Sequence, residues 1–312
     1  PATVLARRWV TPEARALFGG VAAHLFGELN RPLSGSVGMM LTAAAHAKGW
    51  PVAKGGSRAI ADAMTAKLLS LGGEIETGRL VESLDQLGSP DVVMLDTSAR
   101  AAADIIGQRM PGRMAASFRR FRYGPAAFKV DFAVRGDIPW TSAECRRAGT
   151  VHVSGELKEI AAAERDIVRG VMPERPFCLI GQQYLADPSR SRDGVNPVWA
   201  YAHVPSRFEG DATEAIIRQI ERYAPGFRGQ IVATAVRNAA DLEAYNPNYV
   251  GGDISAGANS PTQILMRPRW GVRPYDTGVP GVYLCSSSTP PGAGVHGMCG
   301  LHAANLALAA RR

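Results

Sequence analysis

The C-terminal end of the chain holds the residue types best suited to binding a nucleotide. The apolar run Val282–Leu284 is followed by small hydroxyl side chains, a glycine-rich turn and a helix-forming stretch of small residues. Glycines let a backbone approach a ligand closely, and the first turn of a helix offers free N–H groups and the positive end of the helix dipole. We interpret this segment as part of a cradle for a phosphate or a dinucleotide.

The residues Gly292-Ala-Gly-Val-His-Gly297 satisfy the pattern G-x-G-x-x-G, but their surroundings differ from the dinucleotide-binding fingerprint. That fingerprint needs a following strand and an acidic residue about 20 positions further on, and this sequence stops at Arg312. We therefore expect half of a nucleotide site, with the other half elsewhere or absent. Because Pro1 stands where an initiator methionine would, we expect a fragment or a trimmed product.

A second glycine pair precedes a predicted helix. Gly55 and Gly56 come directly before Ser57, a residue type that caps helix N-termini. The apolar spacing along the helix predicts one buried face, formed by Ile60, Met64, Leu68 and Leu71. Residues 72–73 are glycines that end the helix, and residues 74–77 are predicted to form a short strand. The glycine pair could contact a ligand, although such pairs often serve only the turn.

Composition places the chain among ordinary globular proteins. Its 312 residues are 46% apolar and 20% charged, enough for one large or two moderate domains. The net charge is +7, but the 35 Lys and Arg residues are scattered, so we expect no nucleic-acid partner. No C-x-x-C pair suggests a zinc or redox site, so we expect reduced thiols in a cytoplasmic protein. The four cysteines are Cys145, Cys178, Cys285 and Cys299.

Residues 109–123 combine apolar residues at helical spacing with five arginines. The apolar positions are Met110, Met114, Phe118 and Phe121. Such a helix could lie on an anionic membrane, giving a weak peripheral contact. The alternative, which we favour, is a helix packed in the core with a basic outer face.

The rest of the chain predicts helices first and a sheet later. Residues 1–50 read as helical, with Thr11 as an N-cap before Pro12 and a helix over Met39 to Lys48 that stops at Gly49. The apolar run that follows Asp91 is typical of a strand in a parallel sheet. Between residues 123 and 275, a mixed, largely antiparallel sheet is expected. Its predicted strands are 127–134, 150–153, 177–183, 198–204 and 231–236, with helices over 156–169 and 213–223.

A series of stretches in order along the chain resembles the FAD-dependent oxidoreductases that include phytoene desaturases and amine oxidases, most closely the bacterial phytoene-dehydrogenase-like branch. The first is Gly-Trp-Pro-Val-Ala-Lys-Gly-Gly-Ser, and the last runs from Cys to Gly around the glycine turn. The matching stretches are 49–57, 128–131 with 138–140, 148–155, 199–205, 221–227, 245–253 and 285–300.

The resemblance implies an α/β (α+β) fold, with the remainder of a Rossmann-like FAD domain and a substrate domain built on a mixed, largely antiparallel sheet. On this basis residues 1–50 are a helical part of the substrate region, and 51–108 are part of the FAD-binding domain. Residues 109–275 form the substrate domain, and 276–312 supply the C-terminal strand and helix of the FAD-binding domain.

The resemblance also implies which residues hold FAD. Near the pyrophosphate, the ribityl chain and the flavin edge it places Gly292, Ala293, Gly294, Val295, Gly297 and Met298. The opposite side of the flavin would be lined by Pro51, Gly55, Gly56 and Ser57. Hydroxyl groups for a ribityl or phosphate oxygen would come from Ser286, Ser287, Ser288 and Thr289. His296 could bond a flavin carbonyl, and a structural bond to its own loop is at least as good an explanation.

Three features depart from the family pattern. The N-terminal Gly-rich turn with its acidic residue is not found in this sequence, and the β-meander between Val81 and Asp91 is nearly missing. Ser286-Ser287 also stand where amine oxidases carry Gly-Asp or Gly-Glu. A serine can bond the same oxygens but brings no charge.

Flavin accepts hydride at its own ring, so the protein needs neither metal nor nucleophile, and we assign no catalytic residue and no metal site. The loop with Tyr245, Asn246 and Tyr249 could contact substrate, whereas turn chemistry explains the same residues without a ligand. This loop also contains Asn248 and Asp253.

The scattered histidines and methionines can be explained by core packing as well as by a function. His152 and His203 lie in apolar strand contexts that favour satisfied core histidines. Methionines could line an apolar tunnel, although core packing is the default; they are Met39, Met40, Met64 and Met266.

These observations predict an FAD-dependent oxidoreductase that transfers hydride from an apolar substrate, such as a polyene or isoprenoid, to flavin. The alternative is a non-catalytic substrate-domain fragment, or a module that binds an apolar ligand, needing a partner to complete the FAD site.

Overall fold

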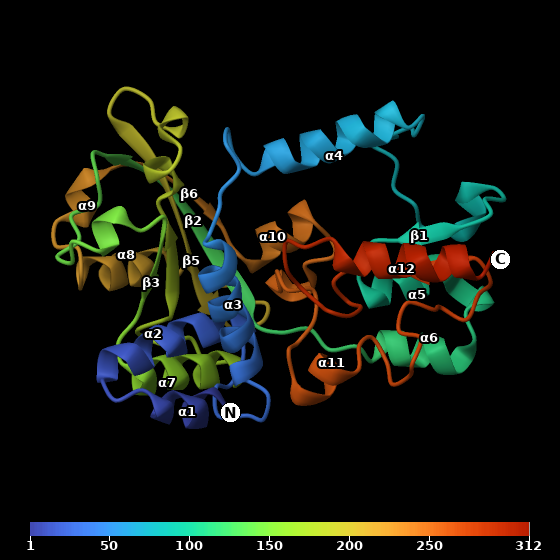
Figure 1. Cartoon of the computed structure of the whole chain (residues 1–312), viewed down its shortest axis with the longest axis horizontal. Coiled ribbons are helices and arrows are strands. Elements are labelled where there is room, and N and C mark those ends of the chain that lie inside the picture. The colour runs from blue at the N-terminus through green and yellow to red at the C-terminus, as the bar shows by residue number, and fades with distance from the viewer. Residues whose placement is uncertain (312) are drawn as a thin grey trace. The chain divides into compact units, whose positions relative to one another are not determined.

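The computed structural model describes residues 1–311, which divide into two compact units (Figure 1). The first unit consists of Pro1–Gly78, Ala127–Pro205 and Glu209–Asn238. The second consists of Arg79–Ala126, Ser206–Phe208 and Ala239–Arg312. These boundaries differ from those expected at residues 50, 108 and 275, and the functional assignment of each segment stays a prediction.

The first unit is built on a five-stranded sheet with strand order β3-β4-β5-β2-β6. Antiparallel pairing joins β3 to β4, β4 to β5, and β2 to β6. The strands are β2 (Ala126–Arg135), β3 (Thr150–Val153), β4 (Cys178–Gly181), β5 (Val195–Val204) and β6 (Ile231–Arg237). The predicted largely antiparallel sheet is therefore confirmed, because alternating apolar residues are a local signal that the sequence displays directly.

One face of this sheet forms the core of the unit. Along β2, Val130, Phe132 and Val134 are buried while the residues between them are only half-buried. The ring of Phe132 meets that of Phe227 edge to face, with centroids 5.4 Å apart. The helices α8 (Thr213–Glu221) and α9 (Phe227–Gln230) supply much of the apolar material of this core.

Four further helices belong to the first unit and follow the sequence signals closely at their ends. They are α1 (Ala2–Leu5), α2 (Pro12–Ala22), α3 (Gly35–Lys48) and α7 (Leu157–Val168). Thr11 caps α2, its Oγ1 accepting from the Ala14 N–H at 3.2 Å. As predicted, α3 ends at Gly49. It begins at Gly35, earlier than the predicted Met39, so residues 35–38 are helical rather than part of a break.

A fifth helix of the first unit, α4 (Arg58–Ser70), forms where predicted, but Ser57 makes no side-chain capping hydrogen bond and the predicted burial is wrong. The apolar positions are 45% to 71% exposed, namely Ile60, Met64, Leu68 and Leu71. No strand forms over residues 74–77. Periodicity reveals an apolar stripe but not what covers it, and a strand needs a neighbouring strand to bond.

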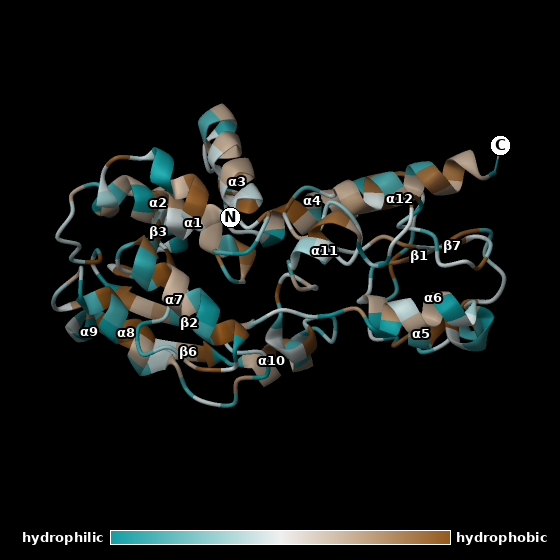
Figure 2. Ribbon diagram, turned by 90° about the horizontal axis from the view of Figure 1, so that it is seen from below, coloured by the Kyte–Doolittle hydropathy of each residue, from teal (hydrophilic) through white to brown (hydrophobic). Residues whose placement is uncertain are grey.

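The second unit contains a short parallel sheet, in which β1 (Val93–Leu95) pairs with β7 (Val282–Leu284). Its helices are α5 (Ala99–Ile106), α6 (Gly112–Arg119), α10 (Ala239–Tyr245), α11 (Pro261–Leu265) and α12 (Met298–Ala309). Much of α12 is coloured as apolar in Figure 2. The parallel strand predicted after Asp91 is confirmed.

Residues 109–123 pack their apolar side chains into the core of the second unit. Met110, Phe118 and Phe121 belong to one buried cluster with residues of β1, β7 and α5. Arg109 and Arg119 lie outside it and pair with Asp85 and Asp104. The core-packing alternative is thus confirmed, and weak membrane contact stays an untested prediction.

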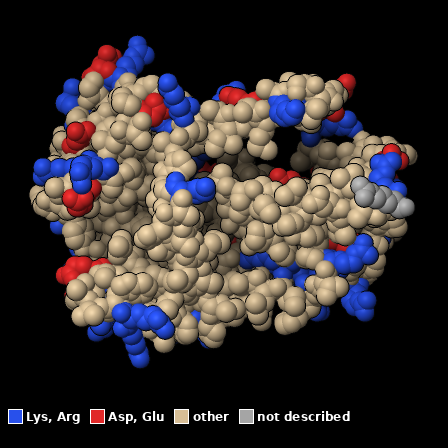
Figure 3. Space-filling view, viewed as in Figure 1, with Lys and Arg blue, Asp and Glu red and all other residues tan. Residues whose placement is uncertain are grey.

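Charged side chains are spread over the molecule. On the face drawn in Figure 3, Lys and Arg occur at several separate places with Asp and Glu among them. Across residues 1–311 no helix has both the length and the apolar character needed to span a bilayer.

The close approach of α3 to α2 gives a first prediction. A Cβ at Gly38 would lie 3.0 Å from the Ala22 Cβ and 3.1 Å from the Phe18 ring. We expect Gly38→Leu to lower the free energy of unfolding by about 1–3 kcal/mol, because the helices must separate. Urea unfolding followed by tryptophan fluorescence measures this. Gly229→Ala, at a position where the added carbon meets nothing within 4 Å, is the control; an equal effect of both would contradict the packing argument.

Candidate functional site

In the second unit, the parallel pairing of β1 and β7 brings the carboxyl ends of both strands to one edge. Residues 96–98 leave β1 there and lead into α5, while residues 285–297 leave β7 and lead into α12. In open α/β sheets this is the edge at which ligands bind. The predicted C-terminal cradle lies here.

Hydrogen bonds between loops hold this edge together. Ser98 caps α5, its side chain accepting from the Ala101 N–H. The Ser98 N–H donates to Asn248 Oδ1 at 2.7 Å, and the Ala99 N–H donates to Ser288 Oγ at 3.3 Å. The start of α5 is therefore fixed by side chains from two distant segments.

Three of the four hydroxyl groups predicted to face FAD are bonded within the protein, and the fourth residue, Ser287, is half-buried. Ser286, Ser288 and Thr289 are buried. Ser288 Oγ donates to the Ala256 carbonyl at 3.2 Å, Thr289 Oγ1 donates to the Ser286 carbonyl at 2.7 Å, and Ser286 Oγ accepts from the Ser288 N–H at 3.2 Å. These groups shape the turn, and their contact with a cofactor stays a prediction that the hydrogen bonds do not favour.

The glycine turn that follows is open. Gly292 is buried, whereas residues 293–297 are exposed. At Gly292 the φ angle is +102°, and a Cβ would lie 2.8 Å from Arg267 Nη1, so only glycine fits. The exposed backbone from Ala293 to the first turn of α12 is the part of the predicted cradle that a ligand can reach.

His296 is exposed and bonds its own loop. Its Nδ1 lies 3.0 Å from the Met298 N–H and accepts from it, which satisfies one free donor at the start of α12. That bond requires a bare Nδ1, so the neutral ring carries its hydrogen on Nε2. His296 therefore does bond its own loop, through a backbone N–H rather than the loop carbonyl that was expected, and its contact with flavin stays a prediction.

A buried arginine that the sequence did not single out supports this turn. Arg267 is 3% exposed, and its guanidinium donates to the Gln263 carbonyl, the Ser287 carbonyl and Asn259 Oδ1 at 2.9 to 3.0 Å. Burial lowers the pKa of Arg267, and the charge of Asp253 opposes that shift. A lone arginine between apolar residues has no spacing signal, so only the structure reveals its role.

Asp253 holds a second loop together from the interior. Its carboxylate accepts the N–H groups of Gly124, Ser255 and Gly257 at 2.7 to 2.9 Å, and the side chain is fully buried. Burial raises the pKa of Asp253, while these three donors and Arg267 act in the opposite direction. Asp253 is therefore an internal anchor of the loop in which the sequence suggested substrate contact.

The predicted substrate residues lie at the end of α10 and in the turn that follows it. Tyr245 is 69% exposed. Asn246 Oδ1 accepts from the Asn248 N–H at 3.1 Å, and the Asn246 carbonyl accepts from the Tyr249 N–H at 2.8 Å. Turn chemistry accounts for these bonds, so contact of Tyr245, Asn246 and Tyr249 with a substrate stays a prediction.

The other predicted FAD residues belong to the first unit. Pro51, Gly55 and Ser57 are exposed. The Gly55 N–H donates to Asp187 Oδ2 at 2.7 Å. Hydrogen bonds from Ser189 first, and then from Gly55 and Arg190, lower the pKa of Asp187 to about 2. With Gly56, which has room around its Cα, these residues form a loop anchored on residues 187–190. This loop belongs to the first unit, whereas residues 286–298 belong to the second.

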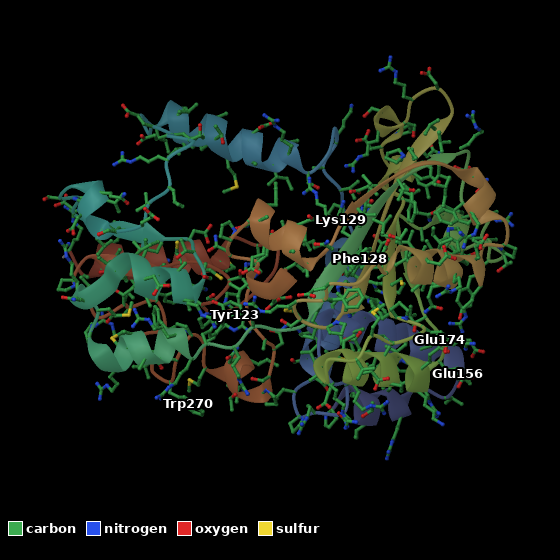
Figure 4. All side chains as sticks on the ribbon, turned by 180° about the vertical axis from the view of Figure 1, so that it is seen from behind. Tyr123, Phe128, Lys129, Glu156, Glu174 and Trp270 are labelled. Atoms are coloured by element: carbon green, nitrogen blue, oxygen red, sulfur yellow. The ribbon has the colours of Figure 1, made fainter. Side chains whose placement is uncertain are left out.

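The first unit also contains a large cavity of about 1450 Å³ that the sequence did not reveal. Its wall is made by α2, β3, α7 and the segments around residues 50–52, 144–149 and 177–186. Glu156, at the start of α7, is one of its charged lining residues (Figure 4). Met39, Met40 and Met64, suggested for an apolar tunnel or the core, are instead 46% to 69% exposed.

Two pairs of side chains contain three of the four histidines of the first unit, His46 being the fourth. His24 Nε2 and His152 Nε2 are 2.9 Å apart, so one imidazole donates to the other. His203 Nδ1 lies 2.6 Å from Glu164 Oε1, and both side chains are buried. His152 and His203 thus each have a side-chain partner, but the prediction that both are satisfied core histidines is only partly met, because His152 is half-buried and the buried Nε2 of His203 bonds no atom among the described residues.

The described residues, 1–311, hold no cluster of three or more metal-ligating side chains. Cys145, Cys178, Cys285 and Cys299 are free thiols. Burial raises the pKa of Cys285 to about 11, helped by the charge of Asp96, so this thiol is protonated at neutral pH.

No protein-family model matches the chain. Over 184 residues it is 27% identical to "Pyridine nucleotide-disulfide oxidoreductase domain-containing protein 2" of Rattus norvegicus, and the protein of that name from Mus musculus gives the same identity. The match covers 55% of this chain and 31% of each rodent protein. The chain thus spans about a third of the length of these curated relatives.

The fold is shared with the crystal structure of an oxidoreductase from Methanosarcina mazei. The TM-score is 0.60 and the identity 13%, over 95% of this chain and 65% of that chain. This likeness shows a common mixed α/β fold. Both comparisons lead to oxidoreductases, and neither singles out the phytoene-dehydrogenase branch.

The cap at residue 296 gives a second prediction. We expect His296→Ala to weaken the first turn of α12 by about 0.5–2 kcal/mol, because the Met298 N–H loses its acceptor. Amide hydrogen exchange in the first turn of α12 measures this. His302→Ala, an exposed histidine further along the same helix, is the control. Unchanged exchange in the His296 variant would show that the imidazole bond does not stabilise the helix.

The His24–His152 pair gives a third prediction, on pH dependence. Burial first, and then the charges of His152 and His203, lower the pKa of His24 from 6.5 to about 3. Burial first, and then the charge of His203, lower the pKa of His152 from 6.5 to about 4. Below pH 6.5 the unfolded chain therefore binds more protons than the folded one, and stability falls as the pH drops towards 4. Each imidazole contributes a slope of up to about 1.4 kcal/mol per pH unit.

Urea unfolding between pH 4 and 7 tests this slope. We expect the double variant His24→Leu with His152→Leu to lose most of it. Leu17→Ala changes the same cavity wall without removing a titrating group and should keep it. A slope that is identical in the wild type and the double variant would contradict the burial of uncharged imidazoles.

Proposed function

We propose that this protein is an FAD-dependent oxidoreductase of the phytoene-dehydrogenase-like kind, which passes hydride from an apolar substrate to flavin. The observation that carries the proposal is the open glycine turn at residues 293–297, which leads from the carboxyl edge of a parallel strand pair into α12. The oxidoreductase fold and the similarity to oxidoreductase-domain proteins support it.

The exposed residues of this turn fit a dinucleotide better than the buried ones do. The backbone of residues 293–297 is accessible, and the start of α12 offers the positive end of a helix dipole to a phosphate. The Nε2–H of His296 is a neutral donor at the same place. By contrast, the hydroxyls of Ser286, Ser288 and Thr289 already have partners, so the backbone and His296 would hold the cofactor.

The chain's own residues would position the reactants. FAD, when bound, supplies the ring that accepts hydride. His296, in its neutral form, would donate from Nε2 without adding charge, and Arg267 would keep the turn in shape through the Ser287 carbonyl. The large cavity of the first unit would hold an apolar substrate away from water. No catalytic acid or base is assigned.

A second candidate is a module that binds an apolar ligand and needs a partner to complete the FAD site. The exposed apolar stripe of α4 favours it, because a row of bare apolar side chains is typical of a surface that packs against another protein part. In this reading the isolated chain binds the apolar ligand but not FAD.

Titration of the purified chain with FAD separates the two candidates, with bound flavin measured by equilibrium dialysis. Val295 is 94% exposed, so Val295→Asp changes the turn without disturbing the core. We expect this variant to weaken FAD binding about 10-fold, since a carboxylate repels the pyrophosphate.

Val10→Asp is the matched control, because Val10 is 89% exposed and lies in the first unit. Equal FAD affinity in both variants would remove the turn from the cofactor site. Failure of the wild-type chain to bind FAD would favour the second candidate.

A further inference from the structure

The wall of the large cavity of the first unit is largely apolar, and besides several charged and polar side chains it contains one polar feature made of two bonded imidazoles. Apolar side chains line it from α2, β3, β4 and β5, and examples are Leu17, Val21, Val151, Leu179 and Trp199. At about 1450 Å³ it exceeds the volume typical of sites for drug-sized ligands. Every residue that lines the cavity belongs to the first unit, so that unit alone forms the site.

The polar feature is the His24–His152 pair, both members of which line the cavity. The two Nε2 atoms, 2.9 Å apart, share one hydrogen. In two neutral rings, one imidazole therefore keeps a bare Nδ1 and the other keeps an Nδ1–H. The hydrogen bond between the two Nε2 atoms leaves both Nδ1 atoms outside it, so the pair offers one further acceptor and one further donor.

The pair is uncharged at neutral pH. Burial lowers the pKa values of His24 and His152 to about 3 and 4. The interior of the cavity thus presents hydrogen-bonding groups without a formal charge, and a charged ligand group there would lose its hydration without gaining a counter-charge.

The charged residues of the wall do not change this conclusion, because each is paired or exposed. Glu159 bonds Arg222 at 2.6 Å, and Glu144 pairs with Arg147. Glu156 and Lys158 are exposed. They belong to the surface end of the wall rather than to the buried histidine pair.

One hydroxyl of the wall has no hydrogen-bond partner within residues 1–311. Ser154 lines the cavity, and its Oγ is shielded from solvent and bonds no atom among the described residues. Buried polar groups in folded proteins are nearly always bonded. Because solvent does not reach this Oγ, the hydroxyl is not evidence for an occupant of the cavity.

We propose that this cavity binds a neutral, largely apolar molecule carrying a hydroxyl or carbonyl oxygen, which the ring nitrogens of the His24–His152 pair hold. A hydroxyl can both donate and accept, and a carbonyl accepts from the protonated Nδ1. The further step, that such a molecule is the substrate, rests on the function proposed above. Its binding in the cavity does not need flavin.

Competition against a neutral fluorescent probe tests the proposal on the whole chain without added flavin. The probe is N-phenyl-1-naphthylamine, excited directly, and the competitors share one chain length: n-decanol, 2-decanone, decanoate and decylammonium. At pH 8 we expect the two neutral competitors to displace the probe at concentrations about 10-fold lower than the two ions. Decanoate or decylammonium binding as tightly as n-decanol would overturn the proposal.

Two variants locate the binding. Ala16 lines the cavity, so Ala16→Trp should abolish probe binding, whereas Ala240→Trp, at an exposed position in α10 of the second unit, should not. The double variant His24→Leu with His152→Leu should keep the probe but bind n-decanol about 10-fold more weakly. Unchanged n-decanol affinity in the double variant, or full probe binding to Ala16→Trp, would overturn the proposal.

The same samples titrated with FAD keep the two proposals distinguishable. If the chain binds the probe and n-decanol but not FAD, the cavity proposal holds and the proposed function fails for the isolated chain. A chain that binds FAD but fails the competition test retains the cofactor site and loses this inference.

Discussion

The second unit depends on the parallel pairing of β1 with β7, because it brings together segments from distant parts of the chain. The bond between the Ala99 N–H and Ser288 Oγ crosses 189 positions of sequence and lies directly beyond that pairing. Once the two strands are in register, the starts of α5 and α12 must lie at the same edge. The buried residues before the open glycine turn hydrogen-bond to one another and to the start of α5. Only the residues after them are left exposed.

That arrangement separates two roles that the sequence pattern presents as one. A run of small hydroxyl residues followed by glycines has the composition of a phosphate cradle, and also the composition of a tight turn that must satisfy its own buried backbone. Here the hydroxyls of Ser286, Ser288 and Thr289 take the second role, and Arg267 fills the space beside Gly292. Ligand access is confined to the exposed residues that follow, where His296 bonds the loop from one nitrogen and leaves the other free.

The sequence predicted those parts of the fold whose signals are local. The strand at 150–153 matches its predicted bounds, and Thr11 caps its helix, because alternation and capping involve neighbouring residues. The exposed stripe of α4 was predicted as buried because spacing does not identify a packing partner. The His24–His152 pair and Arg267 could not be predicted, since the contacts that give them meaning span many positions, 128 for the histidines.

The two candidate sites differ in their electrostatics, so they suit ligands of different charge. Under the proposed function these ligands are the cofactor and the substrate. The start of α12 offers a positive dipole end and accessible backbone donors, so it favours a phosphorylated, anionic group. The cavity of the first unit offers apolar walls and two imidazoles that burial keeps neutral, so it disfavours any ion. An oxidoreductase that takes hydride from an apolar molecule needs both environments, one for a charged cofactor and one for an uncharged substrate. A module that only binds an apolar ligand needs the second alone, and nothing in its chemistry would then require the glycine turn to remain open.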